Sequence, residues 1–350
     1  MSSSQPLVSI IIVDYKRNNP YLKESLKAID RQTYTHFEII LVTDYPVNLT
    51  HPKLKKKSYG HYVGPAQKRD DGAKLAKGSI LSFLDDDAYP SRDWLKNIIT
   101  NFADPKVAAV GGPGVTPPHA HWTEQASGWA SASPMGASLY AYRFIPEKKR
   151  LVDDFPSMNL SVRKSDFNKV KGFDSHYYPG EDTKLCLDLT HKLGKQIVYD
   201  PKALVYHHRR PILFPHLKQN GNFGLHRGFF ARTLPKTSLR PLYFLPSLMV
   251  LGLIFLLFSP IYTHPLLYLV TQIGRTLLGF YLASLCLNAI WILNYSHQPL
   301  QAFLSLPVIF LTHFWYGIII QERQNTTFSQ FGPIIPFLSR TDIMTIRFFL

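Results

Sequence analysis

Short apolar runs recur along the first half of the chain, each about the length of one β-strand. They are Leu7–Val13, Phe37–Val42, Ile80–Leu84 and Val107–Val110. Because these runs are apolar throughout, each predicts a strand that is buried on both faces. Helical patterns at 21–32, at 65–77 and from Ser91 separate them. This rhythm predicts a Rossmann-like α/β domain whose mostly parallel sheet carries helices on both faces.

Acidic residues follow two of these runs, at the point where each strand is expected to end. Asp44 follows the second run, and Asp85-Asp86-Asp87 follows the third. In parallel sheets, ligands bind beyond the carboxyl ends of the strands. Three adjacent carboxylates repel one another unless a cation compensates, and oxygen ligands of this kind suit Mg²⁺ or Mn²⁺ together with substrate phosphates. The pattern favours a metal and phosphate site, and an acidic turn before the next helix is the alternative.

A second acidic pair, Glu181-Asp182, is expected at the start of a helix. Pro179 and Gly180 interrupt the chain before it, and leucines recur at helical spacing after it. A carboxylate at this place can take a proton from an attacking hydroxyl group. Acids that only complement the helix dipole are the alternative interpretation.

The chain has a formal net charge of +15, and its basic residues gather before the apolar C-terminal half. Seven basic residues and no acidic one lie between His207 and Pro241: Arg209, Arg210, Lys218, Arg227, Arg232, Lys236 and Arg240. Because this segment runs directly into an apolar one, it predicts contact with an anionic membrane surface and argues against a nucleic-acid partner.

Three apolar segments follow, at 242–262, 265–294 and 299–320, and the second contains Arg275. Each has about the length that spans a bilayer, so about three transmembrane helices are expected. The N-terminus lacks a signal-peptide pattern, which favours a cytosolic first domain at the cell membrane. Three spans would place the tail outside, whereas its arginines favour the inside, so the number of spans stays open. The predicted division is residues 1–206 for the α/β domain, 207–241 for a basic interfacial segment, 242–322 for membrane helices and 323–350 for an amphipathic tail.

Six motifs occur in the order in which the family 2 glycosyltransferases carry them. They are Val8–Ile12, Glu38–Asp44, Phe83–Asp87, Asn159–Arg163, Gly172–Asp174 and Glu181–Cys186. Over roughly residues 6 to 235 the chain therefore resembles this family. The resemblance implies the GT-A fold, a nucleotide-sugar donor linked to UDP or GDP, and Mg²⁺ or Mn²⁺ as cofactor.

The resemblance also assigns residues to the donor. Those assigned to the nucleotide are Asp14, Asp44, Arg69, Asp85, Asp86, Asn159 and Arg163. Among them, Asp44 is expected to hold the base, and Arg69 to lie between the base and diphosphate sites. Asp14 stands in a segment that departs from the family pattern, so it either contacts the nucleotide or disturbs the base pocket, and the base stays open.

The remaining assignments concern the metal and the acceptor. Asp85, Asp87 and His207 are expected to hold the metal, and Asp182 to act as general base of an inverting transfer beside Glu181. The chain lacks the Gln-x-x-Arg-Trp motif of processive synthases and resembles the non-processive exopolysaccharide-assembly branch. This implies a saccharide on polyprenyl diphosphate as acceptor, and polyprenyl phosphate itself is the alternative.

Two other classes are weaker hypotheses. A transporter with a regulatory nucleotide-binding domain would need more spans with paired polar groups. A glycoside hydrolase also uses two carboxylates, but it needs neither the acidic run nor a nucleotide fold. Both predict no metal-dependent release of nucleoside diphosphate from a sugar nucleotide. The sequence predicts nothing about the oligomeric state.

Overall fold

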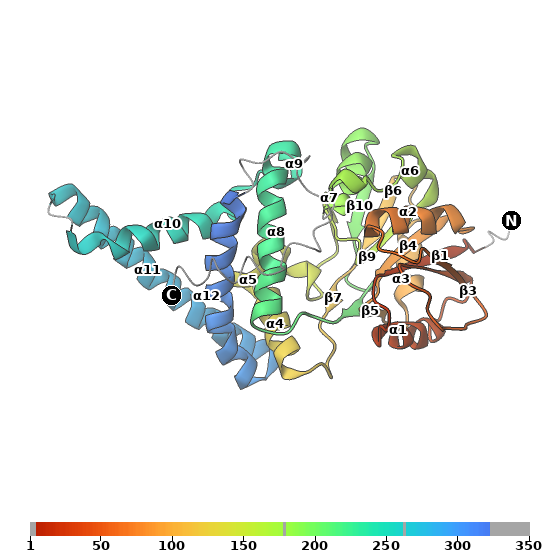
Figure 1. Ribbon diagram of the computed structural model, residues 1–350, viewed down its shortest axis with the longest axis horizontal. Helices are drawn as coiled ribbons and strands as arrows, with labels where there is room; N and C mark the ends of the chain where they lie inside the picture. The colour runs from red at the N-terminus through yellow and green to blue at the C-terminus, as the bar shows by residue number, and fades with distance from the viewer. Residues whose placement is uncertain (1–4, 178–179, 262–263, 323–350) are drawn as a thin grey trace.

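The computed structural model describes residues 5–177, 180–261 and 264–322, and it shows an α/β domain followed by a group of long helices (Figure 1). An eight-stranded sheet in the order β3-β2-β1-β4-β9-β6-β10-β8 forms the centre of the domain. Its strands are β1 Val8–Asp14, β2 Phe37–Thr43, β3 Leu54–Ser58, β4 Ile80–Asp85, β6 Val107–Gly111, β8 Arg150–Val152, β9 Asn159–Arg163 and β10 Gln196–Tyr199. The predicted α/β fold with a mostly parallel sheet is confirmed.

The directions of the strands decide which residues meet at the functional edge. Strands β1, β2, β3 and β4 are parallel, and their register pairs Val13 with Asp85 and Asp14 with Thr43. The acidic residues that end these strands therefore share one edge of the sheet. Strand β9 runs antiparallel to both β4 and β6, so its carboxyl end lies at the opposite edge.

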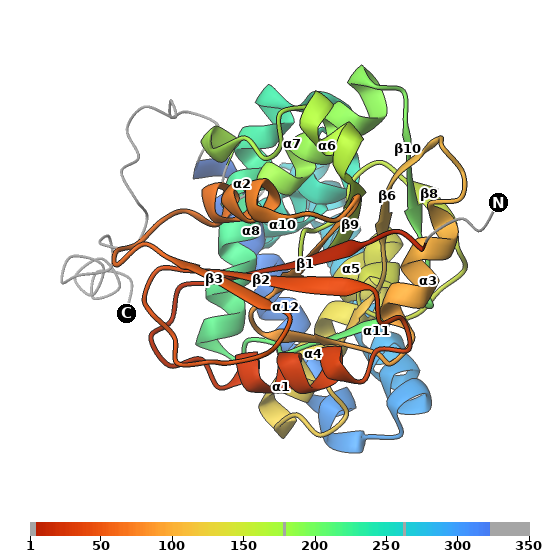
Figure 2. The same ribbon diagram turned by 90° about the vertical axis from the view of Figure 1, so that its right-hand side faces the viewer.

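Helices cover both faces of the sheet, and each face has its own apolar core. Helices α1 (Tyr21–Asp30) and α3 (Trp94–Asn101) pack on one face. Helices α2 (Pro65–Leu75), α6 (Lys164–Lys169) and α7 (Glu181–Leu187) pack on the other, and Figure 2 shows α1 and α2 on opposite sides of the sheet. This sandwich buries the apolar strand runs on both sides, as the sequence predicts.

A second sheet of three short strands completes the functional edge. It consists of β5 (Ala88–Pro90), β11 (Val205–His207) and β7 (Gly114–Val115), in the order β5-β11-β7. Antiparallel pairing of β11 with β5 sets His207 opposite Ala88. A histidine about 120 residues away in sequence thereby reaches the acidic run.

The C-terminal half consists of helices α8 (Phe214–Thr233), α10 (Leu245–Leu257), α11 (Pro265–Ser296) and α12 (Pro299–Glu322), with short α9 (Pro235–Ser238) between the first two. By length and composition, α11 and α12 are long and apolar enough to cross a membrane. Helices α4 (Trp122–Ala132) and α5 (Pro134–Ala137) lie between this group and the sheet (Figure 1).

Two helices of the described residues have the length of a membrane span, and the expectation of about three spans stays a prediction. The predicted first span at 242–262 forms a helix of only 13 residues, preceded by a 3₁₀ turn at Pro241–Phe244. Proline disfavours a helical conformation in the residue before it, and Pro260 closes this segment. The predicted amphipathic tail at 323–350 lies outside the described residues.

Candidate active site

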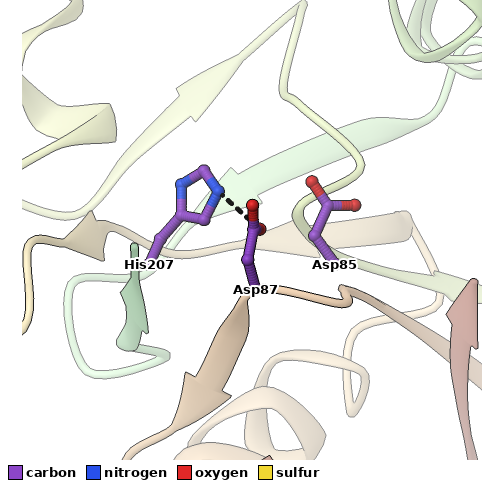
Figure 3. Close-up of side chains that lie close together, drawn as sticks. All are labelled: Asp85, Asp87 and His207. Carbon is purple, nitrogen blue, oxygen red and sulfur yellow. Dashed lines mark ion pairs between the residues drawn. The ribbon is translucent and has the colours of Figure 1, made fainter. Parts of the chain in front are cut away.

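The three carboxylates of the acidic run point in different directions, because they leave the end of β4 in a turn. Asp87 bonds His207, with 3.0 Å between Oδ1 and Nε2, and its Oδ2 accepts from Arg210 Nη1 at 2.9 Å. Asp85 faces the same space from the other side (Figure 3). Burial opposes the charge on Asp87, yet His207 and Arg210 hold its pKa well below the usual range.

Asp85, Asp87 and His207 form a group of potential metal ligands. One ligand atom from each lies within 4.8 Å of the others. Two carboxylate oxygens and one imidazole nitrogen are a donor set that a divalent cation accepts. The structure thus brings together the three residues that the resemblance assigns to the metal.

Asp86 turns away from this group toward the start of the chain. Its Oδ2 accepts from Asn19 Nδ2 at 2.5 Å and lies 3.4 Å from Lys16 Nζ. The same Asn19 amide donates to Asp14 Oδ1 at 3.1 Å. Burial, followed by the charge of Asp87, raises the pKa of Asp86 to about 8. Asp86 and Asp14 therefore share one buried polar cluster.

Asp44 is held by a lysine. Lys68 Nζ lies 2.7 Å from Asp44 Oδ1 and donates to the Asp14 carbonyl oxygen at 2.9 Å, and both side chains are almost fully buried. Burial lowers the pKa of Lys68. The second carboxylate oxygens of Asp14 and Asp44 are buried and have no hydrogen-bond partner among the described residues. Buried acceptors without a donor are costly, so these two oxygens suit a ligand that supplies N–H or O–H groups.

Arg69 connects the acidic run to the second acidic pair. Its Nη2 lies 3.0 Å from Asp85 Oδ1, and its Nη1 lies 2.6 Å from Glu181 Oε1. The side chain extends from α2 and is almost fully buried. One guanidinium thus joins residues that are 96 positions apart in sequence.

Glu181 and Asp182 begin α7, as expected, because Gly180 adopts φ +142° directly before them. Asp182 Oδ1 accepts from the Thr183 N–H at 2.8 Å, and Oδ2 from the Ser157 N–H at 3.2 Å. Burial, with smaller contributions from the charges of Glu181 and Asp154, raises the pKa of Asp182 to about 7. This carboxyl group can therefore gain or lose a proton near neutral pH.

Two residues that are expected to contact the donor have protein partners in the structure. Asn159 donates to the carbonyl oxygens of Gly112 and Ala203 at 2.8 and 2.7 Å and accepts from Trp94 Nε1, so its amide is committed inside the protein. Arg163 lies at the far end of β9, opposite Ile80, and donates to backbone carbonyls there. Asn159 lies at the functional edge, opposite Leu84, whereas Arg163 lies at the other edge of the sheet.

Several basic residues of the segment 207–241 have partners within the protein, and its contact with a membrane surface stays a prediction. Arg210 bonds Asp87, and Arg209 donates to the Gly114 carbonyl oxygen and lies over the Phe144 ring. Farther along, Arg240 and Arg227 pair with acids of the α/β domain, Asp153 at 2.5 Å and Asp154 at 3.9 Å. Much of this positive charge is used inside the protein, and only part of it is available to lipids.

Sequence reasoning missed several residues of the site. Lys68, Asn19 and Arg210 each contact a predicted site carboxylate. Lys68 directly precedes Arg69, and Arg210 follows His207 by three positions, so proximity to predicted residues was the available signal. Nothing in the sequence pattern marks Asn19.

Comparison with known proteins agrees with this geometry. The α/β domain has the GT-A fold, and residues 9–170 of it match the family described as glycosyl transferase family 2.

Its relatives differ in how much of each protein is shared. A pre-mycofactocin glycosyltransferase of Mycobacterium tuberculosis is 30% identical over 176 residues, which cover 50% of this chain but only 36% of that protein. A Methanococcus voltae enzyme is 24% identical over 351 residues, covering 92% of this chain and 99% of that enzyme. Its name is dolichyl N-acetyl-α-D-glucosaminyl phosphate 3-β-D-2,3-diacetamido-2,3-dideoxy-β-D-glucuronosyltransferase.

Among solved structures, a mannosyltransferase from Pyrobaculum calidifontis in complex with GDP-mannose and Mn²⁺ is 20% identical. The similarity covers 66% of this chain and 65% of that one, with a TM-score of 0.48.

Proposed function

We propose that the protein is an inverting glycosyltransferase that moves a sugar from a nucleotide donor to a hydroxyl group of a lipid-linked saccharide. The observation that carries this proposal is the double contact of Arg69, which joins Asp85 on the donor side to Glu181 beside the proposed base. This contact brings the metal and diphosphate ligands and the acidic pair into one site.

The buried carboxylates form the nucleotide end of the site. Asp14 and Asp44 each have a free, buried carboxylate oxygen that can accept from the N–H of a base or the hydroxyl of a ribose. Lys68 and Asn19 hold the two carboxylates in place. The donor is linked to UDP or GDP, since a carboxylate can accept from the ring N–H of either base.

Asp85, Asp87 and His207 fit a divalent cation, Mg²⁺ or Mn²⁺. Such an ion, when bound, would neutralise charge on the diphosphate leaving group. Arg209 and Arg210 lie beside Asp87 and add positive charge on the same side. Fixed positive groups of this kind stabilise charge that develops on a departing diphosphate.

Asp182 is the proposed general base. Its pKa of about 7 suits a group that accepts a proton from a sugar hydroxyl near neutral pH. Glu181, bonded to Arg69 and to its own helix start, keeps the neighbouring backbone in place. Attack by the deprotonated hydroxyl from the side opposite the leaving group inverts the anomeric centre.

The name of the Methanococcus voltae relative describes transfer to a sugar carried on dolichyl phosphate. This supports a lipid-linked saccharide, on polyprenyl diphosphate or a similar carrier, as the acceptor here. The alternative acceptor is polyprenyl phosphate itself, which is already anionic and needs no base. A donor site on the cytosolic side of the cell membrane agrees with supply of nucleotide sugars from the cytosol. A multi-pass anchor stays a prediction.

Substitution Asp182→Asn tests the assignment of the base. We expect transfer to a lipid-linked saccharide to fall by roughly 100-fold or more, because general-base catalysis contributes about 10² to 10⁴. Radiolabelled sugar recovered in the lipid fraction, with Mg²⁺ or Mn²⁺ present, measures the rate. Asp174→Asn serves as a matched control, since Asp174 is half-exposed and its side chain bonds only His176 in the described part of the chain. Unchanged transfer to the saccharide by Asp182→Asn would contradict the assignment of Asp182 as the base.

A further inference from the structure

Helices α11 and α12 have the same apolar composition but different surroundings. The first half of α11 exposes large apolar side chains, such as Leu277 at 63% and Phe280 at 68%. On α12, exposed large apolar side chains are few among the described residues: Leu300, Phe303 and Trp315. Exposed apolar surface of the first kind needs lipid or protein to cover it, whereas most of α12 is already covered by this chain.

Helix α8 covers one side of α12, and α8 is polar. The two helices lie side by side along most of their length (Figure 1). Gly221, Gly224 and Gly228 of α8 allow close approach to the Trp315 and Tyr316 side chains and to the Ile320 backbone of α12. Between and beside these glycines α8 carries lysine, arginine, asparagine and glutamine residues. A membrane-spanning α12 would bring this polar helix into the hydrocarbon with it.

Hydrogen bonds also tie the middle of α12 to the catalytic domain. His216 of α8 bonds Ser127 of α4 at 2.7 Å through Nδ1 and Thr312 of α12 at 3.0 Å through Nε2. On the next residue of α12, His313 Nε2 lies 3.0 Å from the Met135 carbonyl oxygen. Helix α4 is tied to the α/β domain, because its Glu124 lies 3.1 Å from His208, the residue after the proposed metal ligand His207. The centre of α12 is therefore held against the side of the catalytic domain.

The last part of α11 also contacts α4 and α5 beside the catalytic domain. Asn288 Oδ1 accepts from the Met135 N–H at 3.0 Å, and Leu285 is buried against Ala130 of α4. Tyr281 also packs on this cluster and bonds His313 of α12. The roughly 16 residues before it, 265–280, extend over about 24 Å at 1.5 Å per residue, which is most of the thickness of the bilayer hydrocarbon.

Helix α10 is the partner of this free part of α11. Exposed leucines lie along it, including Leu248 at 61% and Leu257 at 74%. Gly274 of α11 contacts the Leu256 side chain near the end of α10. In Figure 1 the two helices project together from the group formed by α8 and α12.

We propose that α10 and α11 form a hairpin that inserts into the lipid bilayer and returns to the face where the catalytic domain lies. Helix α12 then packs at the membrane surface and does not cross it. Arg275 is exposed on α11, and its long side chain can reach toward lipid headgroups. The chain after α12 begins on the catalytic side, where the positive-inside rule favours its Arg323, Arg340 and Arg347. This inference does not depend on the proposed acceptor or base.

Single cysteines in the full-length chain test the arrangement. The background variant carries Cys286→Ser, since Cys286 is exposed on α11 and Cys186 is buried. Asn294→Cys reports on the turn before α12, Tyr268→Cys on the end of the hairpin, and a cysteine added after Leu350 on the tail. Lys23→Cys, on the exposed face of α1, marks the side of the catalytic domain. Each protein is treated with a membrane-impermeant maleimide in sealed vesicles of known orientation.

We expect the cysteines at 294 and after 350 to react in the same vesicles as the cysteine at 23, and the one at 268 to be at least tenfold less reactive there. If α11 and α12 each cross the bilayer, the cysteine at 294 reacts only in vesicles of the opposite orientation. If all three apolar segments cross the bilayer, the cysteine after Leu350 reacts only in vesicles of the opposite orientation. Either result overturns the hairpin, and so does full reactivity at 268 from the catalytic side. A variant that loses its thermal unfolding transition is replaced by one with Tyr295→Cys or Leu266→Cys, which are also exposed.

Discussion

Asp182 occupies an environment that few carboxyl groups share. Its neighbours include two further acids, Glu181 and Asp154, and it is half-buried. Arg69 bonds Glu181, and Arg143 and Thr183 bond Asp154, so each neighbour is held by a partner of its own. Of the three carboxyl groups, Asp182 is therefore the one that we expect to exchange a proton with the substrate.

The rate of transfer should depend on pH through the protonation state of Asp182. Because the pKa of Asp182 is raised to about 7, the carboxyl group is protonated below that pH and cannot act as a base. We expect kcat/KM to fall about tenfold for each pH unit below about 7 and to level off above it. Initial rates between pH 5 and 9 measure the profile. A rate that is constant from pH 5 to 8 would contradict the assignment.

The sequence predicted the residues of the site more reliably where parallel strands carry them. Asp44, Asp85 and Asp87 end parallel strands or follow them, so position in the motif was sufficient to bring them to one edge. Arg163 ends β9, which is antiparallel, so Arg163 lies at the opposite edge, whereas Asn159 begins β9 beside Leu84. The motif does not state the direction of that strand, and direction decides which end of the strand lies at the functional edge.

At the scale of elements, the contact between α8 and α12 depends on small residues. Gly221, Gly224 and Gly228 recur at intervals of three and four, so they lie on one face of α8. The sequence analysis interpreted this region by its charge, and the glycine spacing was the signal for a close helix contact. The apolar composition of α12 predicts a span, but composition does not reveal which neighbours cover a helix.

Substitution Gly228→Ala tests this contact. The added methyl group would meet the Ile320 carbonyl oxygen, which belongs to a helix backbone and moves only with it. We expect destabilisation of about 1–3 kcal/mol, the usual cost of overpacking. Gly279→Ala on α11 is the matched control, because no atom lies within 4 Å of the added carbon there. Thermal unfolding in detergent compares them, and equal midpoints would show that the two helices do not pack this closely.

At the scale of the whole molecule, the arginines and the apolar side chains of the C-terminal half differ in what they contact. Arg209, Arg210, Arg227 and Arg240 bond groups within the protein. Exposed apolar surface lies mainly on α10 and α11. We therefore expect membrane attachment to depend more on apolar burial than on attraction to anionic lipids.

Salt extraction distinguishes these two contributions. At about 1 M salt the Debye length is about 3 Å, which weakens attraction between exposed lysines and lipids but leaves apolar burial intact. We expect the protein to stay in the membrane fraction in high salt, both as wild type and with Lys218→Gln and Lys236→Gln together. The variant with Leu277→Asp and Phe280→Asp should be extracted at least several-fold more easily. Release of the wild type by salt alone would show that electrostatic attraction to lipids holds the protein at the membrane.

The shared guanidinium of Arg69 has a consequence for kinetics. While the donor site is empty, Arg69 divides its charge between Asp85 and Glu181. A cation and a diphosphate arriving at Asp85 would compete for that carboxylate and change how firmly Arg69 holds Glu181. Binding at the proposed donor site would thus change the proposed acceptor site through the Arg69 side chain. We expect substrates to bind in a compulsory order, with the nucleotide sugar first and the acceptor second.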